Sequence, residues 1–314
     1  MIPGVLCTGN IVMDVLARPV DEITWGGTRW VDSITQELGG NGAATCAAIA
    51  MLGVPSRLIG AVGHDLFGTA ALARLKECGV DTRLIERLDS ATATSVALVR
   101  AGGTRAFLHH PGAGRLAFAR PFPLTSQITA GCTRFHIANP FSLPLLRPKV
   151  STMLREAAAL GLSTSLDTAW DALGEWMKTL ASSLPHVGIL FSNEDEARML
   201  TGTADPPLAA ARLRDAGATD IVLKLGPNGC AVFTAGEEWH VPAFQVTAID
   251  STGAGDCFAG AYLAALQRNL PHTEAARVAN AAGAINVRTM GGTAGLLNWE
   301  QTLRWMSMAR QRMA

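Results

Sequence analysis

The residues best placed to do chemistry are four consecutive ones, Gly253, Ala254, Gly255 and Asp256. They follow an apolar stretch, 244–249, that reads as a strand, and they begin a strongly helical segment. A helix N-terminus offers unpaired N–H groups and a positive dipole end, and glycines let these groups converge on an anion. A carboxylate there can take a hydroxyl proton while the N–H groups stabilise a transferring phosphoryl group. The same residues also fit a plain helix start with Asp256 as a favourable first-turn acid.

Two widespread phosphate-binding signatures are missing from the sequence. The G-x-x-x-x-G-K-[ST] loop needs a Gly-Lys pair, which the chain does not contain, and this excludes a P-loop NTPase. The dinucleotide-binding fingerprint should follow the first strand, where "TGNIVMD" has a single glycine, and "GGNGAA" at 39–44 lacks the required spacing. A dehydrogenase is therefore supported only by a general α/β pattern.

Composition narrows the class of protein further. The chain has 314 residues, of which 48% are hydrophobic and 17% are charged, which is typical of a globular protein with a large core. Lysine plus arginine equal aspartate plus glutamate at 26 each, so a basic nucleic-acid-binding face is not expected. The six cysteines are scattered without a C-x-x-C pair, which indicates reduced, buried thiols and no structural zinc.

The N-terminal sequence does not look like a secretory signal, because it lacks a basic n-region followed by a long apolar run. The uncharged stretch 38–56 contains several glycines and Pro55, so it is too polar and too broken to span a membrane. We therefore expect a soluble, cytoplasmic protein that binds neither nucleic acid nor membranes.

The elements that must position the glycine turn alternate between strand and helix patterns. Expected strands lie at 56–63, 134–139, 162–167, 187–193 and 220–226, and expected helices at 43–52, 65–79, 145–161, 194–202 and 206–218. This alternation favours a parallel sheet with helices on both faces. No linker or composition break divides the chain, so 1–314 is predicted to be one α/β domain with a doubly wound, mostly parallel sheet.

Two stretches depart from this rhythm. Residues 92–110 place β-branched runs on both sides of "AGGT", which is typical of a hairpin, and 23–37 has a similar "GGT" between Trp25 and Trp30. We expect β-ribbons inserted at about 15–37 and 92–112, forming either a lid over a site or a cover for a sheet edge. Their apolar side chains suggest a homodimer that pairs through the ribbons.

Four motifs resemble those of the ribokinase-like (PfkB) carbohydrate kinases and appear along the chain in that family's order. They are "DSTGAGDCFAGA" from Asp250, the glycine-rich helix segment 38–68, "NEDE" at 193–196 and "KLGPNG" at 224–229. Together they are far more specific than any one of them. The resemblance implies a ribokinase-like fold with a β-ribbon lid, and phosphorylation of a sugar hydroxyl by ATP.

The resemblance also implies roles for residues around the nucleotide. Asp256 would be the catalytic base, and Gly253, Ala254 and Gly255 would form the anion hole. ATP and Mg²⁺ would be bound by Asn193 and Glu196, which hold the ion through water, and by Lys224, Gly226, Gly229 and Asn280. The residues alone also fit a helix cap with an acid three positions on for Asn193 and Glu196, and a strand end with a tight turn for 224–229.

On the substrate side, the resemblance implies sugar contacts from Asp14, Gly39, Gly40 and Asn41, with Arg105 reaching over the site from a ribbon. Alone, Asp14 also fits a turn acid. Val12 and Ala44 stand where ribokinase itself has sugar-binding asparagines, so ribose is not the expected substrate. Asp250 and Thr252 lie in the region where family members often hold a monovalent cation such as K⁺.

Three alternatives stay open at this point. A nucleoside kinase of the same family would stack its base on apolar groups such as Trp25 or Trp30. A non-catalytic sugar sensor on the same scaffold would have no need of the base, so the intact "GAGD" argues against it. A dehydrogenase is disfavoured by the missing fingerprint, and binding of ATP but not NAD would exclude it.

Overall fold

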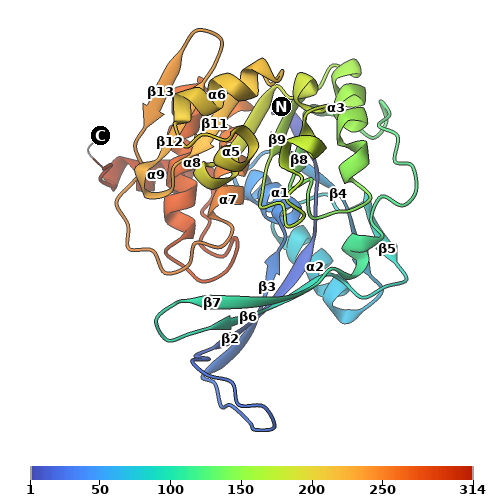
Figure 1. Cartoon of the computed structure of the whole chain (residues 1–314), viewed down its shortest axis with the longest axis vertical. Coiled ribbons are helices and arrows are strands. Elements are labelled where there is room, and N and C mark those ends of the chain that lie inside the picture. Colours follow the sequence, from blue (N-terminus) through green and yellow to red (C-terminus); the bar gives the residue numbers. More distant parts are fainter. Residues whose placement is uncertain (1, 313–314) are drawn as a thin grey trace.

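The computed structural model describes residues 2–312, and within this range the strands form a nine-stranded and a four-stranded sheet (Figure 1). The large sheet has the order β13-β12-β11-β10-β9-β8-β1-β4-β5. Its strands are β1 (Gly4–Thr8), β4 (Ser56–Gly63), β5 (Ile85–Leu88), β8 (Cys132–Ala138), β9 (Ser163–Asp167), β10 (Ile189–Asn193), β11 (Asp220–Lys224), β12 (Cys230–Phe233) and β13 (Glu238–Val241).

The large sheet is parallel from β5 through β11, and only β12 and β13 run antiparallel. Parallel strands covered on both faces read as continuous apolar runs, and β1 is buried along its whole length. The doubly wound, mostly parallel sheet predicted from the sequence is therefore confirmed.

Helices cover both faces of the large sheet (Figure 1). One core cluster contains side chains of α1 (Asn41–Met51), α2 (Leu66–Glu77), α7 (Ala254–Leu266), α8 (His272–Asn286) and α9 (Trp299–Met308). The other contains side chains of α3 (Val150–Ala159), α4 (Trp176–Leu180), α5 (Glu194–Thr201) and α6 (Pro206–Asp215). Among residues 2–312, no helix is both long enough and apolar enough to cross a membrane.

Small residues bring α1 and α7 close together. A Cβ on Gly260 of α7 would lie 2.7 Å from the Cβ of Ala48 in α1, so neither helix tolerates a larger residue at this contact. The alanine-rich sequence of α1 thus serves packing, and it fixes the start of α1 beside the start of α7.

The small sheet consists of β2 (Val12–Arg18), β3 (Ser33–Gly39), β6 (Thr94–Val99) and β7 (Arg105–His110), in the order β3-β2-β6-β7. It projects from the main body at the bottom of Figure 1. β6 and β7 form the expected hairpin. The first ribbon differs from the prediction, because β3 pairs with β2 across the long connection 19–32, and "GGT" lies inside that connection.

The strand expected at 244–249 is not formed. Apart from an isolated bridge between Phe244 and Gln311, this segment has no strand pairing. Phe244 instead packs edge-on against Trp305 of α9, with ring centroids 5.2 Å apart. Phe244 is apolar because its side chain enters the core. Residues 245–252 form an irregular loop that leads to the glycine turn.

A buried histidine gives the fold a predictable response to acid. His136 in β8 is fully buried, its Nδ1 lies 2.9 Å from Ser165 Oγ, and its Nε2 has no hydrogen-bond partner among the described residues. Burial, helped by the charge of Lys224, lowers the pKa of His136 to about 3, while an unfolded histidine has a pKa of about 6.5.

Between these two pKa values the unfolded chain binds a proton that the folded chain does not, so stability should fall with falling pH by up to about 1.4 kcal/mol per pH unit. We expect the difference in unfolding free energy between wild type and His136→Asn to shrink as pH falls from about 7 to about 4.5. Urea unfolding of both proteins across this range measures it. A difference that stays constant with pH would contradict the lowered pKa of the buried His136.

Candidate active site

Polar side chains gather where the parallel strands end. Asn139 follows β8, Asp167 ends β9, Asn193 ends β10 and Lys224 ends β11. Because β8 to β11 are neighbouring parallel strands, their carboxyl ends lie at one edge of the sheet, where α/β proteins bind ligands.

A chain of hydrogen bonds joins this edge to α7. Asn139 Nδ2 donates to Asn41 Oδ1 at 2.7 Å, and Asn41 Nδ2 donates to Asp256 Oδ1 at 2.9 Å. The Asp256 carboxylate is therefore held in one orientation in the first turn of α7. Burial raises the pKa of Asp256, although the Asn41 hydrogen bond and the charge of Lys224 oppose this shift. A raised pKa makes the carboxylate a better proton acceptor.

The turn before α7 requires glycine. Gly253 has φ 70°, and a Cβ on it would lie 2.1 Å from Gly292 O. No side chain caps α7. Ala254 N donates to Ser251 O at 3.3 Å, whereas the N–H groups of Gly253 and Gly255 have no hydrogen-bond partner among the described residues and keep their capacity to bind an anion. A Cβ on Gly255 would lie 3.3 Å from Lys224 Nζ, which places the ammonium group against this same first turn.

Lys224 is paired with a buried acid. Its Nζ lies 2.6 Å from Asp167 Oδ1, and the Asp167 side chain is 3% exposed. Burial raises the pKa of Asp167 to about 7, against the attraction of the lysine. Burial alone would lower the pKa of Lys224, but the charges of Asp167 and Glu196 raise it overall, so the lysine stays protonated.

Asn193 and Glu196 form a complete capping box at the start of α5. Glu196 N donates to Asn193 Oδ1 at 2.8 Å, and Asn193 N donates to Glu196 Oε2 at 3.1 Å. Glu196 Oε2 also accepts a hydrogen bond from Thr168 Oγ1 at 2.7 Å. The cap explains the N-x-x-E pattern locally, and it also fixes a buried carboxylate near Lys224.

The substrate-side residues lie between the two sheets. The Asp14 carboxylate of β2 rests on the backbone of Gly39, where a Cβ would come within 2.1 Å of Asp14 Oδ2, and Glu37 is its cross-strand neighbour. Gly40 has φ 88° and is the N-cap of α1. Burial and the nearby acids Asp250 and Glu37 raise the pKa of Asp14, although Ser95 lowers it.

Arg105 reaches from β7 to the segment before the glycine turn. Its guanidinium pairs with the carboxylate of Asp250, and it also donates to Thr252 Oγ1 at 2.6 Å and to Ser251 Oγ at 3.0 Å. Asp14, Glu37, Arg105 and Asp250 line one pocket with a volume of only about 10 Å³.

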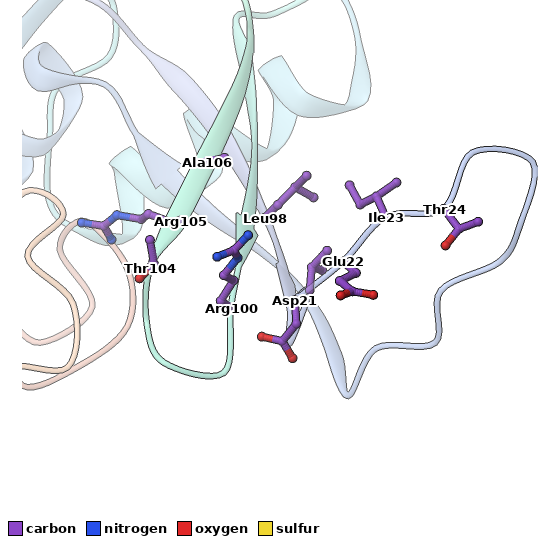
Figure 2. A pocket seen from close by; sticks show the side chains of 10 residues that line it. Asp21, Glu22, Ile23, Thr24, Leu98, Arg100, Thr104, Arg105 and Ala106 are labelled. Atoms are coloured by element: carbon purple, nitrogen blue, oxygen red, sulfur yellow. The ribbon is translucent and has the colours of Figure 1, made fainter.

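A larger hollow, of about 640 Å³, lies farther out on the small sheet (Figure 2). It is lined by the connection after β2, including Asp21 and Glu22, and by the β6–β7 hairpin. Figure 2 shows Arg105 extending away from Asp21 and Glu22, toward the C-terminal half of the chain. The smaller pocket, unlike this hollow, is lined by Asp250, Thr252 and Gly292 beside the glycine turn, so we place the substrate side of the candidate site there.

Two of the expected nucleotide-side residues, Gly229 and Asn280, have internal roles. Gly229 has φ 94°, and a Cβ on it would lie 2.1 Å from Val241 O, so a neighbouring strand requires this glycine. Asn280 Nδ2 donates to Val241 O at 2.9 Å. Gly226 has φ 54° with nothing within 4 Å of its Cβ position, so this turn borders open space.

Sequence reasoning missed Asn139 and Asp167 as site residues. Both directly follow apolar strands, so the rule that ligands bind at the carboxyl ends of parallel strands was the signal that could have found them.

The chain is similar in sequence to known carbohydrate kinases. The sequence pattern of the pfkB family carbohydrate kinases matches residues 3–299. The chain is 29% identical over 263 residues to a ribokinase of Mus musculus, which covers 81% of this chain and 79% of that protein. It is 31% identical over 276 residues to an aminoimidazole riboside kinase of Salmonella typhimurium, which covers 82% and 84%.

Among solved structures, the chain is similar to an E. coli protein provisionally assigned as ribokinase II. The TM-score is 0.87 for its ligand-free form and 0.86 for its complex with ATP and Mg²⁺, at 27% and 26% identity. Both comparisons cover 98% of this chain and 99% of the other.

Proposed function

Because the chain belongs to the pfkB family of carbohydrate kinases, we propose that Asp256 acts as the general base when the γ-phosphoryl group of ATP passes to a hydroxyl of a sugar or sugar derivative. At the coarser level, the chain is an ATP-dependent sugar or nucleoside kinase. The single observation that carries the proposal is the oriented, half-buried Asp256 in the first turn of α7, whose N-cap is Gly253.

In this mechanism different residues accept the proton, bind the phosphoryl group and supply positive charge. Asp256 takes the proton of the substrate hydroxyl as that oxygen attacks the γ-phosphorus in line. The first N–H groups of α7, from Gly253 to Gly255, donate to the phosphoryl oxygens, where negative charge is spread in the transition state. Lys224 faces the same turn and adds a fixed positive charge, held in place by Asp167.

The donor set around Lys224 fits nucleotide-bound Mg²⁺. Three carboxylates, those of Asp167, Glu196 and Asp256, lie close enough to influence one another's charge. Within residues 2–312 no group of three or more His, Cys, Asp or Glu side chains forms a ready-made metal cage. We therefore assign the ion to phosphate oxygens and water, and Asn193 and Glu196 are the residues that would hold that water. When bound, Mg²⁺ would neutralise phosphate charge.

The pocket chemistry favours a polyhydroxylated substrate. Asp14 and Glu37 line the pocket and offer carboxylate oxygens that can accept hydrogen bonds from hydroxyl groups. We assign to the same substrate the backbone and amide groups of Gly39, Gly40 and Asn41, at the end of β3 and the start of α1. Val12 and Ala44 are buried apolar side chains near the same elements, so they cannot replace the asparagines that a ribose site would need.

Substrate entry requires the small sheet to move. The pocket of about 10 Å³ has room for about one water molecule, far less than a sugar needs. We infer that the small sheet is a lid that opens to admit the substrate and closes to exclude water during transfer.

A nucleoside substrate is the second candidate, favoured by the similarity to an aminoimidazole riboside kinase. Its expected stacking partners do not line the pocket, however. Trp25 is 95% exposed and Trp30 is 88% exposed, and both lie in the connection between β2 and β3. A base would have Phe107 as its aromatic neighbour instead.

The test is ADP formation by the purified protein with ATP and Mg²⁺ against sugars, sugar acids, polyols and nucleosides. ADP release that depends on one class of substrate supports the proposal and identifies the class. ATP binding without turnover on any compound would favour a sensor, and failure to bind ATP would overturn the kinase assignment.

We also infer a homodimer through the outer face of the small sheet, the face turned away from the pocket. Strand register places Ala17, Ile34, Val96, Leu98 and Leu108 on this one face. Ile34 is 66% exposed and Leu108 is 65% exposed. An uncovered apolar sheet face is best covered by an identical face, because a two-fold interface brings the same patch from each copy.

We expect the wild-type protein to sediment as a dimer at micromolar concentration and the double variant Ile34→Asp/Leu108→Asp to sediment as a monomer. Leu208→Asp is the matched control, since Leu208 is an exposed leucine on α6, at the other end of the molecule (Figure 1). A monomeric wild type, or a dimer that survives the double substitution, would remove the proposed interface.

A further inference from the structure

The Asp250 carboxylate needs a positive partner. Its side chain is only 1% exposed, and a buried carboxylate is stable only when it is hydrogen-bonded and paired with a cation. Thr252 N and Thr252 Oγ1 donate to Asp250 Oδ1 at 2.8 and 2.7 Å, and Gly291 N donates to Asp250 Oδ2 at 3.1 Å. These donors satisfy its hydrogen bonding but bring no charge.

The charge comes from the small sheet. The Arg105 guanidinium pairs with Asp250 Oδ1 and donates to Thr252 Oγ1, so it occupies side-chain oxygens of both residues in the region that was expected to hold a monovalent cation. A separate ion would compete with the guanidinium for both atoms, and these side chains therefore do not fit a second cation while Arg105 is in place. Figure 2 shows Arg105 as the side chain that leaves the hairpin in this direction.

Asp250 also determines where the anion hole lies. It holds Thr252 through two hydrogen bonds, and Thr252 directly precedes Gly253, the left-handed N-cap of α7. An unpaired charge at Asp250 would repel neighbouring acids such as Asp14 and loosen this segment. The cation at Asp250 is thus linked, through Thr252, to the position of the first N–H groups of α7.

We propose that Arg105 is a positioning residue that supplies the cation at Asp250 from the closed small sheet, so that this protein needs no added monovalent cation. The expected effect on turnover rests on the proposed phosphoryl transfer. The expected effect on folding stability does not depend on that proposal. Removing the guanidinium should leave a buried carboxylate and a threonine hydroxyl that K⁺ can occupy.

The test compares wild type, Arg105→Ala and Arg105→Lys in potassium and in tetramethylammonium chloride, at an equal ionic strength of about 0.1 M so that screening is the same. The first readout is the thermal unfolding midpoint, which needs no substrate. Arg105→Ala should unfold several degrees lower in tetramethylammonium and recover in K⁺, because an ion that binds only the folded state raises its stability. Wild type and Arg105→Lys should unfold at the same temperature in both salts.

The second readout is ADP formation with whichever compound of the panel is turned over. Arg105→Ala should lose at least about 30-fold in tetramethylammonium, as expected when one partner of a buried charge pair is truncated, and K⁺ should restore much of it. Arg100→Ala, an exposed arginine of the same hairpin, should show no salt-specific effect on either readout.

Either of two results would overturn the proposal: a wild type that depends on K⁺, or an Arg105→Ala variant that K⁺ does not rescue. If no compound of the panel is turned over, the proposed function fails, but the unfolding midpoints still decide whether Arg105 replaces a cation.

Discussion

Replacing Asp256 by asparagine should lower kcat by roughly 10²- to 10⁴-fold, the usual cost of losing a general base. The asparagine side chain has the same shape, and its carbonyl oxygen can still accept the hydrogen bond that Asn41 Nδ2 gives to Asp256 Oδ1. The fold and the binding of ATP should therefore be retained. What is lost is the capacity to accept the proton of the substrate hydroxyl.

The competing explanation of Asp256 is that it only stabilises the first turn of α7. A first-turn acid contributes about 0.3–1 kcal/mol to stability and nothing to turnover. Asp195→Asn provides the matched control, since Asp195 is an acid in the first turn of α5 with a side chain that is 72% exposed. Both variants should lose a little stability, and only Asp256→Asn should lose turnover.

ADP release under saturating ATP measures kcat, and calorimetric titration with ATP measures binding separately. An Asp256→Asn protein that turns over at nearly the wild-type rate would remove Asp256 as the base. The capping role would then be the whole explanation of this residue.

The sequence was sufficient to predict the large sheet because its signals are local. A short, mostly apolar run such as 56–63 favours a strand buried on both faces, and β4 spans those same residues. The glycine turn was equally visible, because φ 70° at Gly253 is a conformation that glycine adopts far more readily than other residues.

The errors come from features that depend on distant parts of the chain. The apolar segment 244–249 was expected to be a strand, but Phe244 contacts Trp305, some 60 residues later, and no neighbouring strand is available to pair with it. Likewise, "GGT" at 26–28 resembles a hairpin turn. However, the pairing of β2 with β3 ends at Arg18 and Ser33, so a long connection and not a tight turn joins these strands. Local pattern cannot determine which partner a segment finds.

The same reasoning explains which site residues were found. Asp256 and Glu196 belong to motifs in which the proposed function and the helix start coincide, so they carry a local pattern. Asn139 and Asp167 act through Asn41 and Lys224, whose side chains come from other strands or helices. Their roles follow from the order of the strands in the sheet. The sequence predicts a mostly parallel, doubly wound sheet but not this order.

Replacing Gly253 by alanine should lower kcat by about 10²-fold or more, comparable to the loss of a donor from an oxyanion hole. The added Cβ would lie 2.1 Å from Gly292 O, a backbone atom that cannot move aside alone, and φ 70° disfavours any residue with a Cβ. The turn must therefore shift, and the N–H groups of Ala254 and Gly255 shift with it.

Gly283→Ala is the matched control, because a Cβ on Gly283 in α8 would meet nothing closer than Ala254 O at 3.6 Å. Alanine favours a helix interior over glycine by up to about 1 kcal/mol, so this variant should be at least as stable as wild type and fully active. Far-UV circular dichroism and the unfolding midpoint verify that each variant folds, and ADP release gives kcat.

Gly255→Ala extends the test if Gly253→Ala does not fold. Its Cβ would lie 3.3 Å from Lys224 Nζ, the end of a flexible side chain that can yield without moving the backbone. The fold should survive while the ammonium group is displaced from the first turn of α7, so the KM for ATP should rise with little change in stability. If folded Gly253→Ala and Gly255→Ala both kept wild-type kinetics, the phosphoryl group could not be bound at the start of α7, and the base assigned to Asp256 would lose its reacting partner.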